Sequence, residues 1–374
     1  MTLPTGSELL ADDVELVRTL VDGRAGEWDL AGRLPEDVLR TLGGRGLLCT
    51  QVPRQYGGRG LSSEQTGEFT ASVGALCSSL RSVMTSVGMA AWTIERFGDL
   101  GQRRRYLGEL AGGRLAAVGF SEPDAGSDLA GMTTTVHDDG DHIVLSGEKV
   151  WTTAASYADL LVIVARYADG AAAVVVPSDA PGVRVTKVPD PMGCRAAGHA
   201  NIRLDGVRLP AANLLGATAR PVMMLVTTAL AYGRMSVAWG CVGILRACLE
   251  SAAAHAGTRK QFGQPLAEHQ LVARHLAELY AAERTSTYAC LEASRSWDSR
   301  SPDMVLAAVL AKHVSARHAA EGASAAVQVL ASAGSQDGHV VARAYRDAKM
   351  MEIIEGSTEI CQLLLAQHAV AAHG

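Results

Sequence analysis

The sequence predicts an α+β fold in which a β-domain lies between two helical domains. Three successive patterns along the 374 residues support this prediction. Apolar residues first recur at helical spacing, short β-branched runs follow, and alanine-rich helical stretches fill the remainder. We therefore expect an N-terminal α-helical domain over residues 1–115, a middle antiparallel β-domain over 116–218 and a C-terminal helical bundle over 219–374.

The first domain is expected to be helical because its apolar side chains recur every three or four residues. Val14, Val17 and Val21 illustrate this spacing. Residues 53–60 hold three glycines and a proline between helical stretches, so they are predicted to form a loop.

The middle domain is predicted to be rich in strands. Asp-Gly pairs that end at Gly140, Gly170 and Gly206 are expected to mark hairpins or tight returns, because glycine accepts positive φ. No helical stretch of about ten residues or more separates the apolar runs, which favours an antiparallel sheet or barrel over alternating strands and helices. These runs lie at 143–145, 160–164, 172–176 and 183–188.

The last domain is predicted to be a helical bundle. Three long alanine-rich stretches lie near 221–256, 267–297 and 301–333, and a shorter stretch and a tail follow. Alanine on several faces of one helix indicates close packing on other helices and on partner subunits.

Composition and charge exclude several classes of function. Subtracting 39 acidic from 34 basic residues leaves a formal charge of −5, which gives no general attraction to nucleic acid or anionic membranes. Seven scattered cysteines without a C-x-x-C pair predict a reducing, cytoplasmic location and no metal site. No export signal and no uncharged apolar run of about 18 residues is apparent, so no membrane span is expected.

Common nucleotide-binding and hydrolase motifs are absent. The sequence holds no P-loop, no G-x-G-x-x-G, no H-E-x-x-H and no G-x-S-x-G. Its 11 histidines form no cluster, and none is assigned a role.

One motif nevertheless resembles a known family. Residues 119–131, GFSEPDAGSDLAG, are similar to the flavin-contacting signature of the acyl-CoA dehydrogenase family. Further family-like motifs follow in the same order, at 147–153, 259–263, 346–349 and 355–360, so the resemblance spans nearly the whole chain. It implies a dehydrogenase that binds FAD and oxidises a short acyl thioester of coenzyme A or of an acyl carrier protein.

The chemistry of several motif residues agrees with flavin binding. Ser121 and Thr153 carry short hydroxyl groups suited to one hydrogen bond at the edge of a flavin ring, and Trp151 offers a flat face, although a strand tryptophan is usually core packing. The resemblance assigns Arg259 and Gln328 to the FAD of a neighbouring subunit, which implies a homodimer or homotetramer. The full set of predicted FAD-binding residues is Phe120, Ser121, Trp151, Thr153, Arg259, Phe262, Gln328, Ser357 and Glu359.

Glu355 is the predicted catalytic base. Its sequence neighbours are apolar, and burial would raise the pKa of its carboxyl towards that of a working base. The resemblance implies that it removes the α-proton of the acyl thioester while the β-hydrogen leaves as hydride. Some family members carry the base on another helix, where this chain has Gly233. The resemblance also places Arg234 near the base, Ser127 on the pantetheine arm and Gly356 against the substrate.

The chain departs from the family pattern in two places. Ala331 and Ser332 stand where the family often has two glycines, and Gln362 and Gln367 stand where it commonly has arginines. FAD geometry is therefore expected to differ locally near residue 331.

Composition and resemblance narrow the range of acyl groups that we expect the protein to act on. Only 5% of the residues are aromatic, which agrees with a small acyl group. The chain resembles family members that make hydroxymalonyl or methoxymalonyl extender units for polyketides. Two alternatives remain open, a catabolic short-chain acyl-CoA dehydrogenase and a non-catalytic binding protein of the same fold. The electron acceptor is expected to be an electron-transferring flavoprotein, or dioxygen if the protein is an oxidase.

Overall fold

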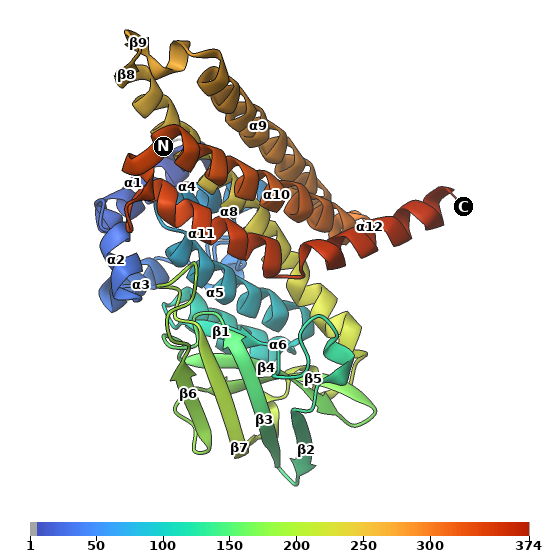
Figure 1. The fold of residues 1–374 in the computed structure, drawn as a ribbon. Coiled ribbons are helices and arrows are strands. Elements are labelled where there is room, and N and C mark those ends of the chain that lie inside the picture. The colour runs from blue at the N-terminus through green and yellow to red at the C-terminus, as the bar shows by residue number, and fades with distance from the viewer. Residues whose placement is uncertain (1–5, 374) are drawn as a thin grey trace, which may run out of the picture.

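The computed structural model describes residues 6–373 and begins with a group of helices (Figure 1). Ser62 starts α4 with a capping box, in which its hydroxyl accepts a hydrogen bond from the Gln65 backbone while the Gln65 side chain reaches back. Residues 53–60 form a loop with one 3₁₀ turn, Arg54–Tyr56, as predicted. The helices are α1 (Gly6–Val21), α2 (Ala25–Ala31), α3 (Glu36–Gly44), α4 (Ser63–Leu76), α5 (Ser78–Phe97), α6 (Leu100–Gln102), a π turn (Arg103–Leu107) and α7 (Gly108–Ala111).

A twisted sheet follows, below α5 in Figure 1. The strand order is β1-β4-β2-β3-β7-β6, and β5 also pairs with β4. The strands are β1 (Ala116–Gly119), β2 (Thr135–Asp139), β3 (His142–Thr152), β4 (Leu160–Tyr167), β5 (Gly170–Pro177), β6 (Val183–Lys187) and β7 (Ala200–Pro210). The four predicted runs match β3 to β6, whereas β1, β2 and β7 had not been identified.

The sequence had predicted an antiparallel sheet, but part of the sheet is parallel. β1 pairs with β4 in parallel, and β2 meets β4 in the same sense at one residue pair. The antiparallel hairpin β2–β3 lies between β1 and β4 in the chain, so the chain reverses twice and enters β4 in the direction of β1. The pairs β2–β3, β3–β7, β6–β7 and β4–β5 are antiparallel.

Two of the three predicted turns are hairpin turns, and the third is a bulge. Gly140 joins β2 to β3 with a φ of 63°, and residues 168–169 join β4 to β5. Gly206, with a φ of 58°, instead lies inside β7, opposite a shift of register between Leu145 and Gly147 of β3. A bulge needs the same positive φ as a turn, so the Asp-Gly pattern does not separate the two.

Long helices complete the fold, and the predicted stretches agree with the three longest. α8 is long enough and apolar enough to cross a membrane. Most of its apolar stretch is buried among the other helices, as in the core helix of a bundle. The elements are α8 (Val222–Thr258), β8 (Lys260–Gln261), β9 (Gln264–Pro265), α9 (Gln270–Asp298), α10 (Met304–Leu330), α11 (Val340–Ile353) and α12 (Thr358–His373). Short 3₁₀ turns lie at Leu129–Gly131, Ala211–Asn213, Leu215–Ala217, Leu266–Glu268 and Ala331–Ser335.

Small residues let α8 lie close to its neighbours. A Cβ atom on Gly243 would lie 2.3 Å from the backbone oxygen of Ala71 on α4, and one on Gly322 of α10 would lie 2.6 Å from Leu245. Close packing of this kind joins α4, α8 and α10, while α5 lies next to the sheet and α12 projects away from the body (Figure 1).

Candidate active site

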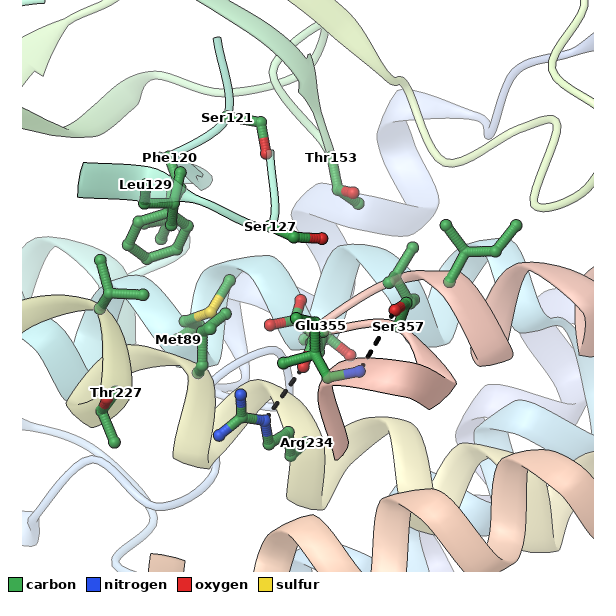
Figure 2. A pocket seen from close by; sticks show the side chains of 18 of the residues that line it. Met89, Phe120, Ser121, Ser127, Leu129, Thr153, Thr227, Arg234, Glu355 and Ser357 are labelled. Atoms are coloured by element: carbon green, nitrogen blue, oxygen red, sulfur yellow. Dashed lines mark hydrogen bonds between the residues drawn. The ribbon is translucent and has the colours of Figure 1, made fainter. Parts of the chain in front are cut away.

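A cavity of about 890 Å³ lies where the sheet meets the helical layer (Figure 2). Its upper wall comes from the ends of β1 and β3, and its floor comes from α5, α8 and the turn between α11 and α12. Nine residues predicted from sequence line it together: Phe120, Ser121, Ser127, Trp151, Thr153, Arg234, Glu355, Gly356 and Ser357.

Four predicted residues lie outside this cavity. Phe262 is at the tip of the β8–β9 hairpin with 95% of its surface exposed, and Arg259 precedes that hairpin at the end of α8. Gln328 is exposed on α10 and Glu359 in the first turn of α12. A role for Arg259, Phe262 and Gln328 in binding FAD therefore depends on a second subunit.

Glu355 lies in a tight turn that buried cations hold in place. Its φ is 56°, and the φ of Gly356 is 94°, so two successive residues adopt conformations that favour glycine. Arg234 Nε donates to the backbone oxygen of Glu355 at 3.0 Å (Figure 2). Lys312 Nζ donates to the backbone oxygens of Gly356 at 2.7 Å and of Glu352 at 3.3 Å. The two cations thus bind the backbone of the turn and not the carboxylate.

The carboxylate itself is poised to accept a proton. Its Oε2 atom is buried and has no hydrogen-bond partner among the described residues. Burial raises the pKa of Glu355 to about 7, although the charges of Arg234, Lys312 and Arg81 act in the opposite direction. A carboxyl group with a pKa near neutrality is suited to general-base catalysis.

α8 lies close to this carboxylate at Gly233. A Cβ atom on Gly233 would lie 2.3 Å from Glu355 Oε2. A side chain at 233 would therefore require the carboxylate of Glu355 to move from its present position.

The sheet wall presents aromatic and hydroxyl groups. Trp151 has a φ of 54° and is 52% exposed, so its side chain is not core packing. Its backbone N–H donates to Asn201 Oδ1 at 3.1 Å, and Ser86 donates to the carbonyl of Thr153 at 2.9 Å. Figure 2 shows the Ser121, Ser127 and Thr153 side chains around the upper part of the cavity. The hydrogen bonds of Trp151 and Thr153 fix the backbone at the end of β3 beside the cavity.

A buried ion pair fixes the loop that follows β1. Lys149 Nζ lies 2.7 Å from Glu122 Oε1 and donates to the carbonyl of Phe120 at 3.0 Å. Burial opposes ionisation of Glu122, but hydrogen bonds from Lys149, Thr134 and Thr133 prevail and lower its pKa to about 2. The pair joins β3 to the loop that carries Ser121 and Ser127.

His199 is a cavity residue that the sequence analysis left without a role. Its Nδ1 lies 3.3 Å from Thr153 Oγ1, and its Nε2 has no partner among the described residues. Burial lowers its pKa to about 4, so the ring is neutral at pH 7.

Comparison with known proteins identifies the family. Three acyl-CoA dehydrogenase models match the chain, for the N-terminal domain at residues 8–114, the middle domain at 117–207 and the C-terminal domain at 223–370. The chain is 35% identical over 347 residues to YngJ of Bacillus subtilis, described as a probable acyl-CoA dehydrogenase, with 91% of each chain covered. The chain belongs to the acyl-CoA dehydrogenase family. It is accordingly an FAD-dependent oxidoreductase.

Solved structures of family members have the same fold. FkbI, described as acting in biosynthesis of the methoxymalonyl extender unit of the polyketide FK520, is 60% identical, with a TM-score of 0.92 over 96% of this chain and 99% of that one. A glutaryl-CoA dehydrogenase from Mycobacterium smegmatis in complex with FADH2 is 25% identical, with a TM-score of 0.90 over 97% and 94% of the two chains.

The sheet wall of the cavity fits FAD. Trp151 presents an exposed flat face, Ser121 and Thr153 present hydroxyl groups, and the buried hydroxyl of Thr152 has no partner among the described residues. A flavin ring needs such a combination of one flat surface and a few hydrogen bonds at its edges.

Proposed function

We propose that this protein oxidises short acyl thioesters carried by an acyl carrier protein, in the formation of an extender unit of the methoxymalonyl type. The observation that supports the chemistry best is the buried carboxylate of Glu355 at the cavity floor, with its pKa raised to about 7. The 60% identity with FkbI over nearly the full length of both chains supports the carrier-bound substrate.

In this mechanism Glu355 removes the α-proton of the acyl group. Arg234 and Lys312 keep the carboxylate in position through the backbone of the turn and leave its oxygens free to accept the proton. FAD, when bound, supplies an acceptor for the β-hydrogen as hydride. Because its Oε2 atom is buried and accepts no hydrogen bond from the described residues, the carboxylate keeps its basicity.

The sheet wall would hold the flavin. We assign Phe120, Ser121, Trp151 and Thr153 to the ring on the basis of their place in the cavity. Ser357 borders the same cavity, and Glu359 lies two residues further on at the start of α12. Ser127 lies on the exposed part of the loop after β1, where it would meet the pantetheine arm of the thioester (Figure 2).

A second subunit would complete the FAD site. Phe262 is exposed on a hairpin far from the sheet, and the apolar side chains of Tyr280 on α9 and of Leu363 and Val370 on α12 are also exposed (Figure 1). Exposed apolar groups on projecting elements support a homodimer or homotetramer, in which Arg259 and Gln328 would reach a neighbouring FAD. An electron-transferring flavoprotein remains the proposed electron acceptor.

A catabolic short-chain acyl-CoA dehydrogenase is the second candidate. The bovine short-chain specific acyl-CoA dehydrogenase is 30% identical over 362 residues, with 93% of this chain covered. Both candidates use Glu355 as the base and the sheet wall to hold the flavin. They differ in whether an acyl carrier protein or coenzyme A carries the acyl chain.

The deciding experiment is an anaerobic visible spectrum of the flavin-loaded protein, recorded before and after adding each substrate. One substrate is a short acyl-CoA, and the other is the same acyl group on an acyl carrier protein. We expect the carrier-bound form to bleach the flavin band at the lower concentration. Bleaching by acyl-CoA alone would support the catabolic candidate, and a protein that takes up no FAD would overturn both.

A further inference from the structure

The cavity reaches the surface on its helical side as well as beside the sheet. Met223 in the first turn of α8 and Pro302 and Asp303 just before α10 line the cavity and are exposed. On the sheet side the exposed lining includes Trp151, which we assign to the flavin. A thioester that shares the cavity with the flavin is therefore expected to enter between the starts of α8 and α10. We call Met223, Pro302 and Asp303 the helical mouth.

Two arginines flank the helical mouth in the chain. Arg220 precedes Met223 by three residues, and Arg300 precedes Pro302 by two. Chain length alone keeps the paired Cα atoms within about 11 Å and about 7 Å of each other. Arg300 is exposed, and Arg220 is half-buried with an Nε atom that has no partner within the described residues. The backbone thus places both residues beside the entrance.

A contact between two tryptophans brings a third arginine, Arg96, to the same place. Trp92 on α5 and Trp297 on α9 pack with ring centroids 4.6 Å apart. Trp92 Nε1 donates to the carbonyl of Thr228 on α8 at 3.0 Å, and the guanidinium of Arg96 lies 5.4 Å from the centre of the Trp92 ring. Arg300 follows Trp297 by three residues. The end of α5 therefore meets the start of α8 and the turn before α10.

Positive charge is in excess around the helical mouth. Burial raises the pKa of the half-buried Glu95, and three arginine charges act in the opposite direction. They belong to Arg96, Arg103 and Arg300, which therefore lie around one carboxylate. Residues 92–105, 218–224 and 299–304 together hold six arginines and three acids, a net charge of +3 in a chain whose net charge is −5.

The sheet side of the entrance carries the opposite charge. Asp124 and Asp128 flank Gly126 and Ser127 in the loop after β1, and all four residues are exposed. Gly126 and Ser127 line the cavity. The positive surface is thus restricted to the helical side, which determines the side from which an acidic partner would approach.

We propose that the helical mouth and the arginines around it form the docking surface for the carrier protein. An acidic face of the carrier pairs with the arginines, and its pantetheine arm enters past Met223 towards Glu355. Met223 and Met224 are 59% and 48% exposed, and their flexible side chains supply an apolar contact. Coenzyme A would cover a small part of a surface that three segments build, whereas a protein face spans it. This inference rests on the proposed function, since it places the carrier at the same site.

The test measures binding of an acidic acyl carrier protein that bears phosphopantetheine to the flavin-loaded protein, by fluorescence anisotropy. For the wild-type protein, the Kd should rise about tenfold as salt increases from about 0.05 M to about 0.3 M, because salt screens exposed charges. Arg96→Glu combined with Arg300→Glu should raise the Kd by about 100-fold.

A matched control reverses two exposed arginines elsewhere. Arg184 and Arg203 lie opposite each other on β6 and β7, at the end of the sheet away from β5, whose Ala171 pairs with the backbone of Arg220. Arg184→Glu combined with Arg203→Glu changes the total charge by the same amount and should change the Kd by less than about twofold.

A substrate without the carrier shows whether the variants still fold and react. Butyryl-pantetheine has the arm but no protein, so it should reduce the flavin of the Arg96→Glu, Arg300→Glu variant within about twofold of the wild-type rate. The butyryl group on the carrier should lose about 100-fold in kcat/KM, mainly through KM. Arg300→Gln, a single change in an exposed turn, should raise the Kd by about fivefold and answers the question if the double variant takes up no flavin.

The possible failures are distinguishable. Carrier binding that changes neither with salt nor in the Arg96→Glu, Arg300→Glu variant would overturn the docking surface and leave the proposed function intact. Equal losses in the two double variants would also overturn it, because total charge would then govern binding. A wild-type protein that binds no carrier and reacts equally with butyryl-pantetheine and carrier-bound butyryl would instead overturn the carrier-bound substrate of the proposed function.

Discussion

The wall and the floor of the cavity both bury charged side chains, and they stabilise them differently. On the sheet wall, Lys149 and Glu122 lie 2.7 Å apart and the pKa of Glu122 is lowered to about 2. On the helical floor, Arg234 and Lys312 donate to backbone carbonyls, while Glu355 Oε2 has no hydrogen-bond partner within residues 6–373 and the pKa of Glu355 is raised to about 7. Paired charges hold a loop in place, whereas an unpaired carboxylate keeps its capacity to bind a proton.

The largest effect is expected from Glu355→Gln. The amide cannot accept the α-proton, so substrate-dependent bleaching of the flavin should slow by about 1000-fold or more. Because the substitution also removes an unpaired buried charge, the free energy of unfolding at pH 8 should rise, by about 2 kcal/mol. Stopped-flow spectra and chemical unfolding measure the two effects. A variant that bleaches at nearly the wild-type rate would contradict the assignment of the base.

Lys149→Met should have the opposite effect on stability. It leaves Glu122 buried without its cation, and removing one partner of a buried pair destabilises by about 3–5 kcal/mol. Flavin affinity should fall as well, since the loop that carries Ser121 loses its anchor. The control is Arg208→Met, which breaks an exposed pair with Asp139 and should change stability by about 0–1 kcal/mol. Equal effects of the two substitutions would show that the buried Lys149–Glu122 pair does not stabilise the sheet wall.

Gly233→Ala should disturb the base without changing its chemistry. The new Cβ atom would lie 2.3 Å from Glu355 Oε2, so the carboxylate must shift from its present position. A displacement of about 1 Å lowers rates by about 100-fold, and flavin binding should be unaffected because Gly233 lies on the floor. A variant with unchanged kcat would show that the carboxylate has space to adjust.

The smallest predicted effect is the pH dependence of the wild-type protein. The base must be ionised to accept a proton, so kcat/KM should fall about tenfold for each pH unit below about 7 and level off above it. Stability should follow the opposite trend. The folded protein holds the Glu355 proton more tightly than the unfolded chain, whose pKa is near 4.5, so the free energy of unfolding should decrease between pH 4.5 and about 7. In Glu355→Gln this part of the stability profile should disappear.

Much of the architecture could be predicted from the sequence, because periodicity reports which faces are buried. The long helices and β3 to β6 carry clear patterns. β1 is only four residues long, β2 has a single buried residue and few apolar side chains, and β7 is interrupted by the bulge at Gly206. The parallel pairing of β1 with β4 depends on contacts across about 40 residues, which local pattern does not specify.

Site residues that stand in a sequence motif could be predicted. Site residues that are brought to the cavity only by tertiary contacts could not. Glu355, Trp151 and Thr153 stand in motifs, and all three line the cavity. Arg81 and Lys312 are single charged residues in long helices, and sequence alone does not show that they are buried. For Arg81 one signal was available, since it occurs among Ser82, Thr85 and Ser86 on the same helical face.

Ala331 illustrates how a departure from the family pattern is tolerated. It stands where the family often has glycine, and it adopts a φ of 51° at the end of α10. The glycine-like backbone is thus kept although the glycine is lost, at an expected expense of about 1–2 kcal/mol.

The contact between Gly233 and Glu355 also constrains how this site could have changed over evolutionary time. The two positions are 122 residues apart in the chain, yet a side chain at one would enter the volume that the carboxylate of the other occupies. A lineage that moved the base from one helix to the other would bring two carboxylates into the same volume if it kept both. Substitutions at the two positions should therefore appear as linked exchanges in the family's history, with one large and one small residue at each stage.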